Sequence, residues 1–314
     1  MQIDQQILSA QLQKFITMIL LGFFAHRVGL VSGEIHDRLN SFVMRVIVPA
    51  QLIGTVASSG GSESLRLLAP MTLGGLALFC LLFLFGQASG RLLGFRGDKL
   101  RVHTGLTFVG STGFFGIPLV TALLGGLGAA AFGLFSLVDN LYVWTVGLQM
   151  SRGVQTAAPK AGWRALLRRF LEPATAAVFV GWAFLLLRVP AEGVFLRSLC
   201  AIGDCAGPLA MLCIGITISR SNWRILPRSW PALVVAALRM VLAPLVAYRA
   251  CLALGVYQPA AICLALTAAM PSSSMFALMC KDNGSTEADY AAGAAILTVL
   301  CSMGTLPLVA RLLC

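Results

Sequence analysis

The chain has 314 residues, of which 58% are hydrophobic and only 11% are charged, and its mean hydropathy is +0.86. A soluble domain is about 45–50% apolar and about 25% charged, so this composition excludes a soluble enzyme with a solvated surface and predicts one polytopic membrane domain. The net charge of +11 arises from short clusters of lysine and arginine between apolar runs. Such clusters are typical of cytoplasmic loops rather than of a nucleic-acid-binding surface.

Ten apolar stretches approach the roughly 20 residues that a helix needs to cross a bilayer. In chain order they are residues 7–25, 39–58, 67–90, 102–124, 127–150, 171–188, 198–218, 230–250, 258–280 and 287–311. The segments between them carry glycine, proline and charge, as connectors do. We therefore expect a first five-helix repeat over residues 1–150, a basic cytoplasmic linker over 151–169 and a second five-helix repeat over 170–314.

The distribution of basic residues supports this count of spans. If the spans alternate in direction, 15 of the 23 lysines and arginines lie on one side of the membrane, 5 lie on the other and 3 lie within spans. Basic connectors face the cytoplasm. Both ends of the chain are therefore expected on the extracytoplasmic side.

The two groups of five spans share spaced motifs. Pro49 in the second span and Pro208 in the seventh are 159 positions apart, and Thr107 in the fourth and Thr267 in the ninth are 160 apart. An odd number of spans in each repeat means that the two repeats are inverted relative to each other, as in many secondary transporters. The predicted fold class is an all-α polytopic membrane protein with ten transmembrane helices in a 5+5 inverted repeat.

The fourth and ninth spans are predicted to be broken helices. In the fourth, Gly110, Gly113 and Gly116 surround Ser111 and precede Pro118, and in the ninth Pro271 is followed by three serines. Exposed backbone is tolerated at membrane depth only where it lines a cavity, so matched breaks indicate a binding site near the midplane. The helix N-terminus after each break would suit a carboxylate. The alternative is a pair of kinks in which the serines bond back to the preceding turn.

Residues 110–119, which read GSTGFFGIPL, resemble the fourth-helix signature N-T-G-F-x-G-I-P-L of the auxin efflux carrier family. The segments around Pro49, Pro208 and Pro271 fit the same family. The resemblance implies that the fourth and ninth helices unwind and cross at the centre. It also implies a transport domain and a scaffold domain, each drawn from both repeats, that move against each other in an elevator-type mechanism. The resemblance also indicates the class of substrate, because members of the family carry small organic anions: malonate or malate in bacteria, and auxin in plants. The short central linker resembles bacterial members, which indicates the cell inner (plasma) membrane, and relatives often form homodimers through the scaffold domain.

The site residues follow from the breaks and from this resemblance. Helix crossover is expected at Gly116, Pro118 and Pro271. Substrate binding is expected at Gln51, Ser111, Thr112, Gly113, Asn140, Pro271, Ser272 and Ser273. This chain has Ser111 where the family usually has asparagine, and serine is shorter and supplies a single hydroxyl.

Asp139, Arg45 and Arg239 are charged residues that lie within the predicted spans. Asp139 is a candidate for proton or ion coupling, or else it makes a structural hydrogen bond or pairs with Lys14 or Arg45. Arg45 is a candidate for attracting the anion, and the alternative is that its side chain extends to the membrane interface. Arg239 is expected in a salt bridge or in helix packing.

The sequence carries no enzyme signature: the HExxH, GxSxG and P-loop strings are absent, and the three histidines fall in basic connectors. We expect no catalysis, no metal and no cofactor, apart from H⁺ or Na⁺ as a coupling ion. Two other functions remain open. One is a sodium-coupled symporter of the bile-acid type, which shares the crossover layout, and the other is a membrane sensor or channel.

Overall fold

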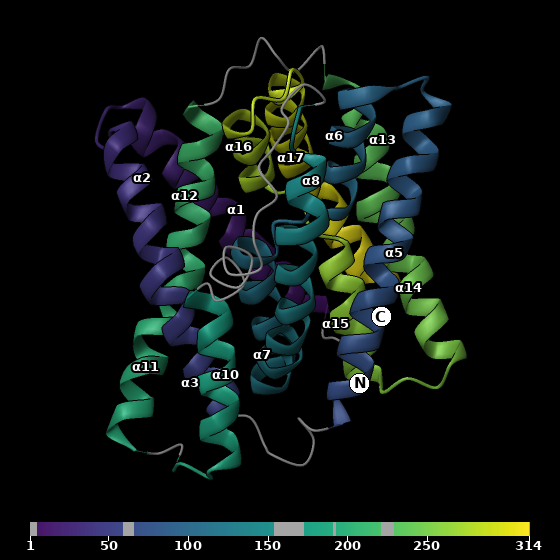
Figure 1. Cartoon of the computed structure of the whole chain (residues 1–314). Helices are drawn as coiled ribbons and strands as arrows, with labels where there is room; N and C mark the ends of the chain where they lie inside the picture. Colours follow the sequence, from purple (N-terminus) through teal and green to yellow (C-terminus); the bar gives the residue numbers. More distant parts are fainter. Residues whose placement is uncertain (1–4, 59–65, 154–172, 191–192, 221–228, 314) are drawn as a thin grey trace. The chain divides into compact units, whose positions relative to one another are not determined.

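A computed structural model describes residues 5–58, 66–153, 173–190, 193–220 and 229–313. In these ranges each of the ten predicted spans falls on helical residues, although several are interrupted (Figure 1). The helices, with short π-helical turns labelled η, are α1 (Gln5–Arg27), α2 (Gly33–Phe42), η1 (Val43–Ile47), α3 (Val48–Ser58), α5 (Leu68–Leu92), α6 (Gly97–Phe108), η2 (Thr112–Gly116), α7 (Ile117–Tyr142), η3 (Val143–Gly147), α8 (Leu148–Met150), α10 (Pro173–Leu186), α11 (Val194–Asp204), α12 (Ala206–Arg220), α13 (Ala232–Ala236), η5 (Ala237–Leu242), α14 (Ala243–Ala253), α15 (Gln258–Ala268), α16 (Ser274–Asp282) and α17 (Ala288–Leu313).

The all-helical architecture agrees with the predicted fold class. Among the described residues, five helical stretches are long and apolar enough to cross a membrane on their own: Ala69–Leu92, Leu123–Met150, Val194–Arg220, Ala232–Ala253 and Ala288–Val309. The ten-span count and the inverted repeat stay predictions. Most of the predicted linker over 151–169 lies outside the described residues.

The chain divides into two compact units, and each draws on both halves of the sequence. Unit 1 comprises Met1–Met71, Gly113–Leu137 and Leu171–Ser221, and unit 2 comprises Thr72–Thr112, Val138–Phe170 and Asn222–Cys314. The boundary at 151–169 is therefore a boundary in sequence, whereas the compact units interleave segments from before and after it.

In unit 1, α1 packs closely along α12, and α3 packs against α10 and α11. Glycines make the first of these contacts possible. A Cβ at Gly22 would overlap the carbonyl of Leu212, and a Cβ at Gly215 would overlap the carbonyl of Ile19. Small residues that let backbones approach are the usual basis of helix association in membranes, where apolar side chains gain little by leaving lipid.

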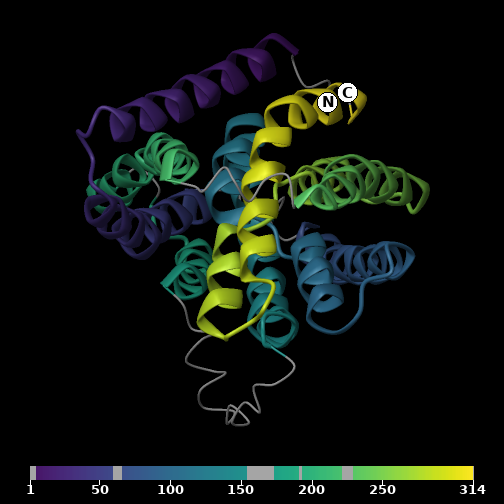
Figure 2. The ribbon, with the colours of Figure 1, turned by 90° about the horizontal axis from the view of Figure 1, so that it is seen from above.

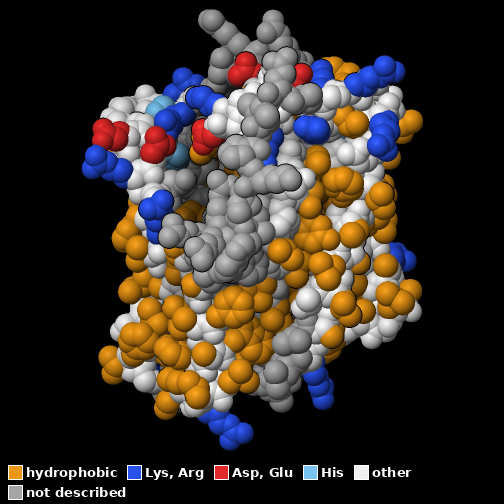
Figure 3. All heavy atoms as spheres, viewed as in Figure 1, with side chains coloured by type: hydrophobic (Ala, Val, Ile, Leu, Met, Phe, Trp, Pro, Cys, Tyr) orange, Lys and Arg blue, Asp and Glu red, His pale blue; other side chains and the backbone are white. Residues whose placement is uncertain are grey.

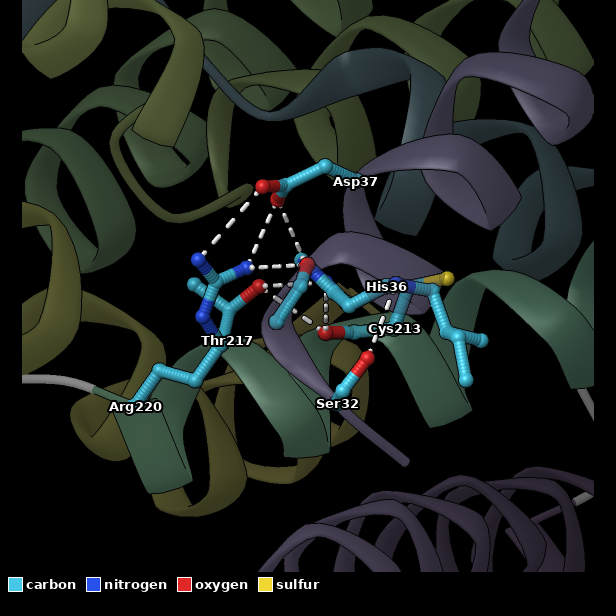
Figure 4. Close-up of polar contacts among 8 residues, drawn as sticks. Ser32, His36, Asp37, Cys213, Thr217 and Arg220 are labelled. Carbon is cyan, nitrogen blue, oxygen red and sulfur yellow. Dashed lines mark hydrogen bonds and ion pairs between the residues drawn. The ribbon is translucent and has the colours of Figure 1, made fainter. Parts of the chain in front are cut away.

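A polar cluster at one end of unit 1 joins α2 to α12 (Figure 4). Arg220 Nη1 donates to Asp37 Oδ1 at 2.6 Å and lies 2.8 Å from His36 Nδ1. The hydrogen bond from Arg220 lowers the pKa of Asp37 below its ordinary value. His36 is buried, and its Nε2 lies 3.1 Å from the carbonyl of Cys213. The connectors before α2 and after α12, which the charge pattern assigns to the same side of the membrane, are thus linked.

Large hydrophobic side chains cover the outer surface of unit 1 over α10 and α11 (Figure 3). Phe179, Leu187, Val194 and Phe195 are each more than half exposed. Charged side chains gather instead at the end of α2 (Figure 3). An apolar belt with charge beyond its end is the surface that a bilayer requires.

In unit 2, α16 lies beside α17, and α14 lies beside α15 (Figure 2). The expectation that His103 lies in a connector is wrong, because α6 begins at Gly97 and places this residue inside the helix. The His103 ring is fully buried and is hydrogen-bonded to Ser89 Oγ at 2.9 Å and to Tyr290 Oη at 2.8 Å. The His103 imidazole therefore links α5, α6 and α17 through side-chain hydrogen bonds.

Three connectors of unit 2 meet at one end. Thr286 donates to Asp98 at 3.2 Å, and Asn283 donates to the hydroxyl of Ser151 at 2.9 Å. These contacts join the start of α6, the end of α8 and the turn between α16 and α17. The charge pattern assigns all three to the cytoplasmic side, so their contact fits the predicted alternation of spans.

Candidate transport site

The two predicted breaks lie against each other inside unit 2. Helix α6 ends at Phe108, and the backbone is extended at Val109. Helix α15 ends at Ala268, and a turn at Ala269 and Met270 leads to extended backbone at Ser273. Gly110 and Ser272 form an antiparallel bridge, in which the N–H of Ser111 donates to the carbonyl of Pro271 at 2.8 Å. The N–H of Ser273 donates in turn to the carbonyl of Val109 at 3.1 Å. The breaks thus satisfy part of each other's backbone, which membrane burial demands.

Ser272 anchors the second break to two helices. Its side chain is fully buried, its hydroxyl donates to the carbonyl of Leu106 at 2.7 Å, and its N–H donates to Thr298 Oγ1 on α17 at 3.1 Å. Ser273 caps α16, because its hydroxyl accepts the N–H of Met275 at 3.2 Å. Both serines were predicted to bind substrate. In the structure their hydroxyls, and the N–H of Ser272, form hydrogen bonds within the protein instead.

Arg239 holds the helix ends that precede the breaks. It lies on η5 and is 2% exposed. Its Nε donates to the carbonyl of Met270 at 2.7 Å, and its Nη1 donates to the carbonyl of Thr107 at 2.6 Å. A Cβ at Gly110 would overlap its Nη2. One guanidinium thus caps two C-terminal helix ends, where the backbone carbonyls carry partial negative charge.

Asp139 contacts the first break at Thr112, whereas Arg239 contacts the helix end that precedes this break, at Thr107. It is 8% exposed, and its Oδ2 accepts the hydroxyl of Thr112 at 2.6 Å. Its Oδ1 is buried and has no hydrogen-bond partner among the described residues. Within that part of the chain, Asp139 and Arg239 are the two buried residues of the aspartate, glutamate, lysine and arginine types. They interact electrostatically without forming a direct ion pair.

The first break keeps one uncommitted hydroxyl. The side chain of Ser111 is half-buried, and its Oγ makes no hydrogen bond within the described part of the chain. Asn140 follows Asp139 on α7 and is likewise half-buried in unit 2. Ser111, Thr112, Asp139 and Asn140 therefore belong to one compact unit with Pro271.

The remaining predicted site residues belong to unit 1. Gly113 and Gly116 lie on η2, Pro118 lies in the first turn of α7, and a Cβ at Gly116 would meet the ring of Phe132 at 2.6 Å. Gln51 is buried on α3, where its Cα would lie 2.5 Å from a Cβ at Gly203 of α11. Arg45 is exposed on η1, and Lys14 is exposed on α1.

Sequence reasoning missed two residues that the structure places at the breaks. Arg239 was expected in a salt bridge or in packing, yet its partners are main-chain carbonyls, which no side-chain pattern reveals. Thr298 has no charge to draw attention within its apolar stretch. An arginine in the middle of the apolar stretch 230–250 was the available signal for the first of them.

The model of the family described as membrane transport protein matches residues 7–310. The chain belongs to this family, the auxin efflux carriers. The resemblance of residues 110–119 is thereby confirmed, and the chain is a membrane transport protein.

Curated relatives of this family extend over most of the chain. An uncharacterized transporter of Methanothermobacter thermautotrophicus is 25% identical over 301 residues, which cover 93% of this chain and 94% of the relative. A protein of Rhizobium meliloti named "Putative malonate transporter" is 24% identical over 304 residues, which cover 93% and 91% of the two chains. Both similarities span the two breaks and both compact units.

Proposed function

We propose that this auxin efflux carrier family protein is a secondary transporter of a small organic anion, of the mono- or dicarboxylate class, and that the anion binds at the paired breaks of unit 2. The observation that carries the proposal is the bridge between Gly110 and Ser272. Two extended segments held together by backbone hydrogen bonds, in a family of transport proteins, provide interrupted helices of the kind that bind ions in other carriers. The Rhizobium relative, named for malonate, supports the choice of a carboxylate.

Hydrogen bonds within the protein reduce the number of donors that are available to bind the anion. The N–H groups of Ser111, Ser272 and Ser273 are used within the protein. The Ser111 hydroxyl would therefore bind the carboxylate, together with backbone N–H groups that follow each break. Asn140, which the family resemblance assigns to the site, would fix the orientation of the anion. This assignment differs from the sequence-based prediction, in which Ser111, Ser272 and Ser273 all contact the substrate.

Asp139 is the group we assign to proton coupling. A buried carboxylate with one unpartnered oxygen is costly to keep ionised. Protonation removes that cost, and an arriving anion makes protonation more favourable still, because like charges repel in a medium of low dielectric constant. Uptake of the anion would thus be accompanied by a proton, and Asp139→Asn would abolish the pH dependence of binding.

The movement that exposes the site to each side would follow the division into two units. Unit 2 carries the paired breaks and would act as the transport domain, and unit 1 would act as the scaffold in an elevator-type mechanism. The scaffold would also provide the surface for a homodimer. The charge pattern and the linked connectors of each unit support both termini being extracytoplasmic in the cell inner membrane.

Ligand-induced thermal stabilisation of the purified protein tests the proposal. Malonate, malate and indole-3-acetate are added at about pH 5.5 and 7.5, and a saturating anion at a hundredfold excess over its Kd adds about 2.7 kcal/mol. Ser111→Ala removes a hydroxyl that makes no hydrogen bond within the described residues, so the variant should keep the wild-type melting temperature and lose most of the anion-induced shift. Ser198→Ala, on the exposed surface of α11, is the matched control.

Two results would overturn the proposal. One is stabilisation by sodium or by a steroid-like amphiphile in the absence of any carboxylate effect, which favours the bile-acid type. The other is an anion-induced shift of equal size in the wild type and in Ser111→Ala.

A further inference from the structure

The side chain of Arg239 is hydrogen-bonded to the backbone next to both breaks. Its two hydrogen bonds run to Thr107 at the end of α6 and to Met270 just after α15, so one guanidinium spans two helix ends that lie far apart in sequence. These carbonyls are left without an intrahelical donor when the helix stops. Two bonds of 2.6 and 2.7 Å from a rigid, planar group fix the distance between the two ends as well as satisfying them.

The local sequence is shaped around this guanidinium. Gly110 lies at the centre of the bridge, and any side chain there would overlap Arg239 Nη2. The next two residues carry the first break onward to Asp139, through the Thr112 hydroxyl. The first break thus runs between the buried cation and the buried acid.

The charges of unit 2 are balanced in a particular way. Arg239 and Asp139 are both buried, of opposite sign and not in direct contact. In the described part of the chain, Asp139 accepts a hydrogen bond from Thr112 and interacts electrostatically with Arg239. Other titratable side chains are buried on nearby elements, but in the described part of the chain they make no hydrogen bond to Asp139. His103 on α6 is bonded to Ser89 and Tyr290, and Cys263 on α15 is fully buried. Arg239 is therefore the positive charge that balances an ionised Asp139.

We propose that Arg239 is a positioning residue for the anion site: it holds the two breaks in register and supplies the fixed positive charge that Asp139 balances when the site is empty. The inference rests on the proposed function, because the site it positions is the carboxylate site. When an anion binds, Asp139 is protonated and the buried charge stays near zero. Arg239 itself keeps its two carbonyl bonds and need not touch the anion.

Three arginine variants test the proposal. Arg239→Lys keeps the charge but can reach only one carbonyl at a time, whereas Arg239→Gln removes the charge. Arg249→Gln, on the exposed surface of α14, is the matched control. The readout is the Kd of malonate, malate and indole-3-acetate, measured from pH 5 to 8 on detergent-purified full-length protein, with the melting temperature of each variant recorded alongside.

Each variant has a distinct expected result. Arg239→Lys should weaken anion binding at least tenfold, which is about 1.4 kcal/mol, and leave the pH midpoint of binding near that of the wild type. Arg239→Gln should also move that midpoint to higher pH by about one unit or more, because the buried positive charge that favours ionised Asp139 has been removed. Arg249→Gln should change neither quantity.

The failures can be told apart. If the wild type binds none of the three anions, the proposed function fails and the inference falls with it. If the wild type binds an anion and both Arg239 variants bind it equally well, the positioning role is wrong. If the two variants lose affinity and melting temperature together with no change in the pH midpoint, Arg239 is a packing residue and the charge role is refuted. Should Arg239→Gln fail to fold, an unchanged affinity in Arg239→Lys still overturns the proposal.

Discussion

The anchor of the second break can be removed by a nearly isosteric substitution. Thr298 accepts the N–H of Ser272 at 3.1 Å, and both residues are fully buried. Thr298→Val replaces the acceptor with a methyl group of similar size, so the N–H of Ser272 is left buried without a partner. An unsatisfied buried donor costs about 1–3 kcal/mol. The hydroxyl of Thr298 also donates to the carbonyl of Ala295 within its own helix. The control variant must therefore lose a bond of this local kind and nothing else.

Thr305→Val provides that control on the same helix. Thr305 donates to the carbonyl of Cys301 at 3.1 Å and accepts no N–H from a break. We expect Thr298→Val to melt several degrees below Thr305→Val, since about 1 kcal/mol moves the melting temperature by about 2–4 °C in domains of 150–250 residues. The assay is thermal unfolding in detergent without ligand. Equal melting temperatures for the two variants would refute the role of Thr298 as the anchor.

Three further predictions concern packing, acid stability and orientation. Gly105→Ala should lower the melting temperature by an amount equivalent to about 1–3 kcal/mol, because its Cβ would overlap the ring of Phe276; adding Phe276→Leu should restore part of the loss, and no recovery would count against this contact. The lowered pKa of Asp37 means that its ion pair stabilises the fold above about pH 4 and that this contribution, under about 1 kcal/mol for an exposed pair, disappears as the pH falls; Asp37→Asn should therefore flatten the acid end of the curve of melting temperature against pH. An epitope inserted after Gly284 should be accessible only from the cytoplasm and one after Gly255 only from outside, and the reverse pattern would overturn the assigned orientation.

The positions of the helices could be predicted because lipid imposes a simple requirement on the sequence. A stretch of apolar residues between charged connectors must be helical, since its backbone has no water to bind. Glycine and proline around Ser111 and Pro271 located the two breaks for the same reason. His103 lies at the start of the predicted stretch 102–124, and its polar ring was assigned to a connector although Ser89 and Tyr290 satisfy it inside the helix bundle.

The details of the site could not be predicted, because they depend on backbone partners. The sequence shows three serines after Pro271 but not that Ser272 uses its hydroxyl and its N–H within the protein. The sequence shows Arg239 in the middle of an apolar stretch, but not that both its hydrogen bonds run to carbonyls at the two breaks. These contacts are set by how the ends of α6 and α15 meet, and residue type carries no signal for them.

The central claim is that a small organic anion crosses the membrane by way of the paired breaks. Uptake of radiolabelled malonate into proteoliposomes tests it most directly, with malate and indole-3-acetate as competitors and an imposed proton gradient. The account predicts saturable uptake that the gradient stimulates in the wild type, with a raised KM in Ser111→Ala and an unchanged KM in Ser198→Ala. Absence of uptake or competition by any of the three carboxylates, or an identical KM in Ser111→Ala, would contradict it.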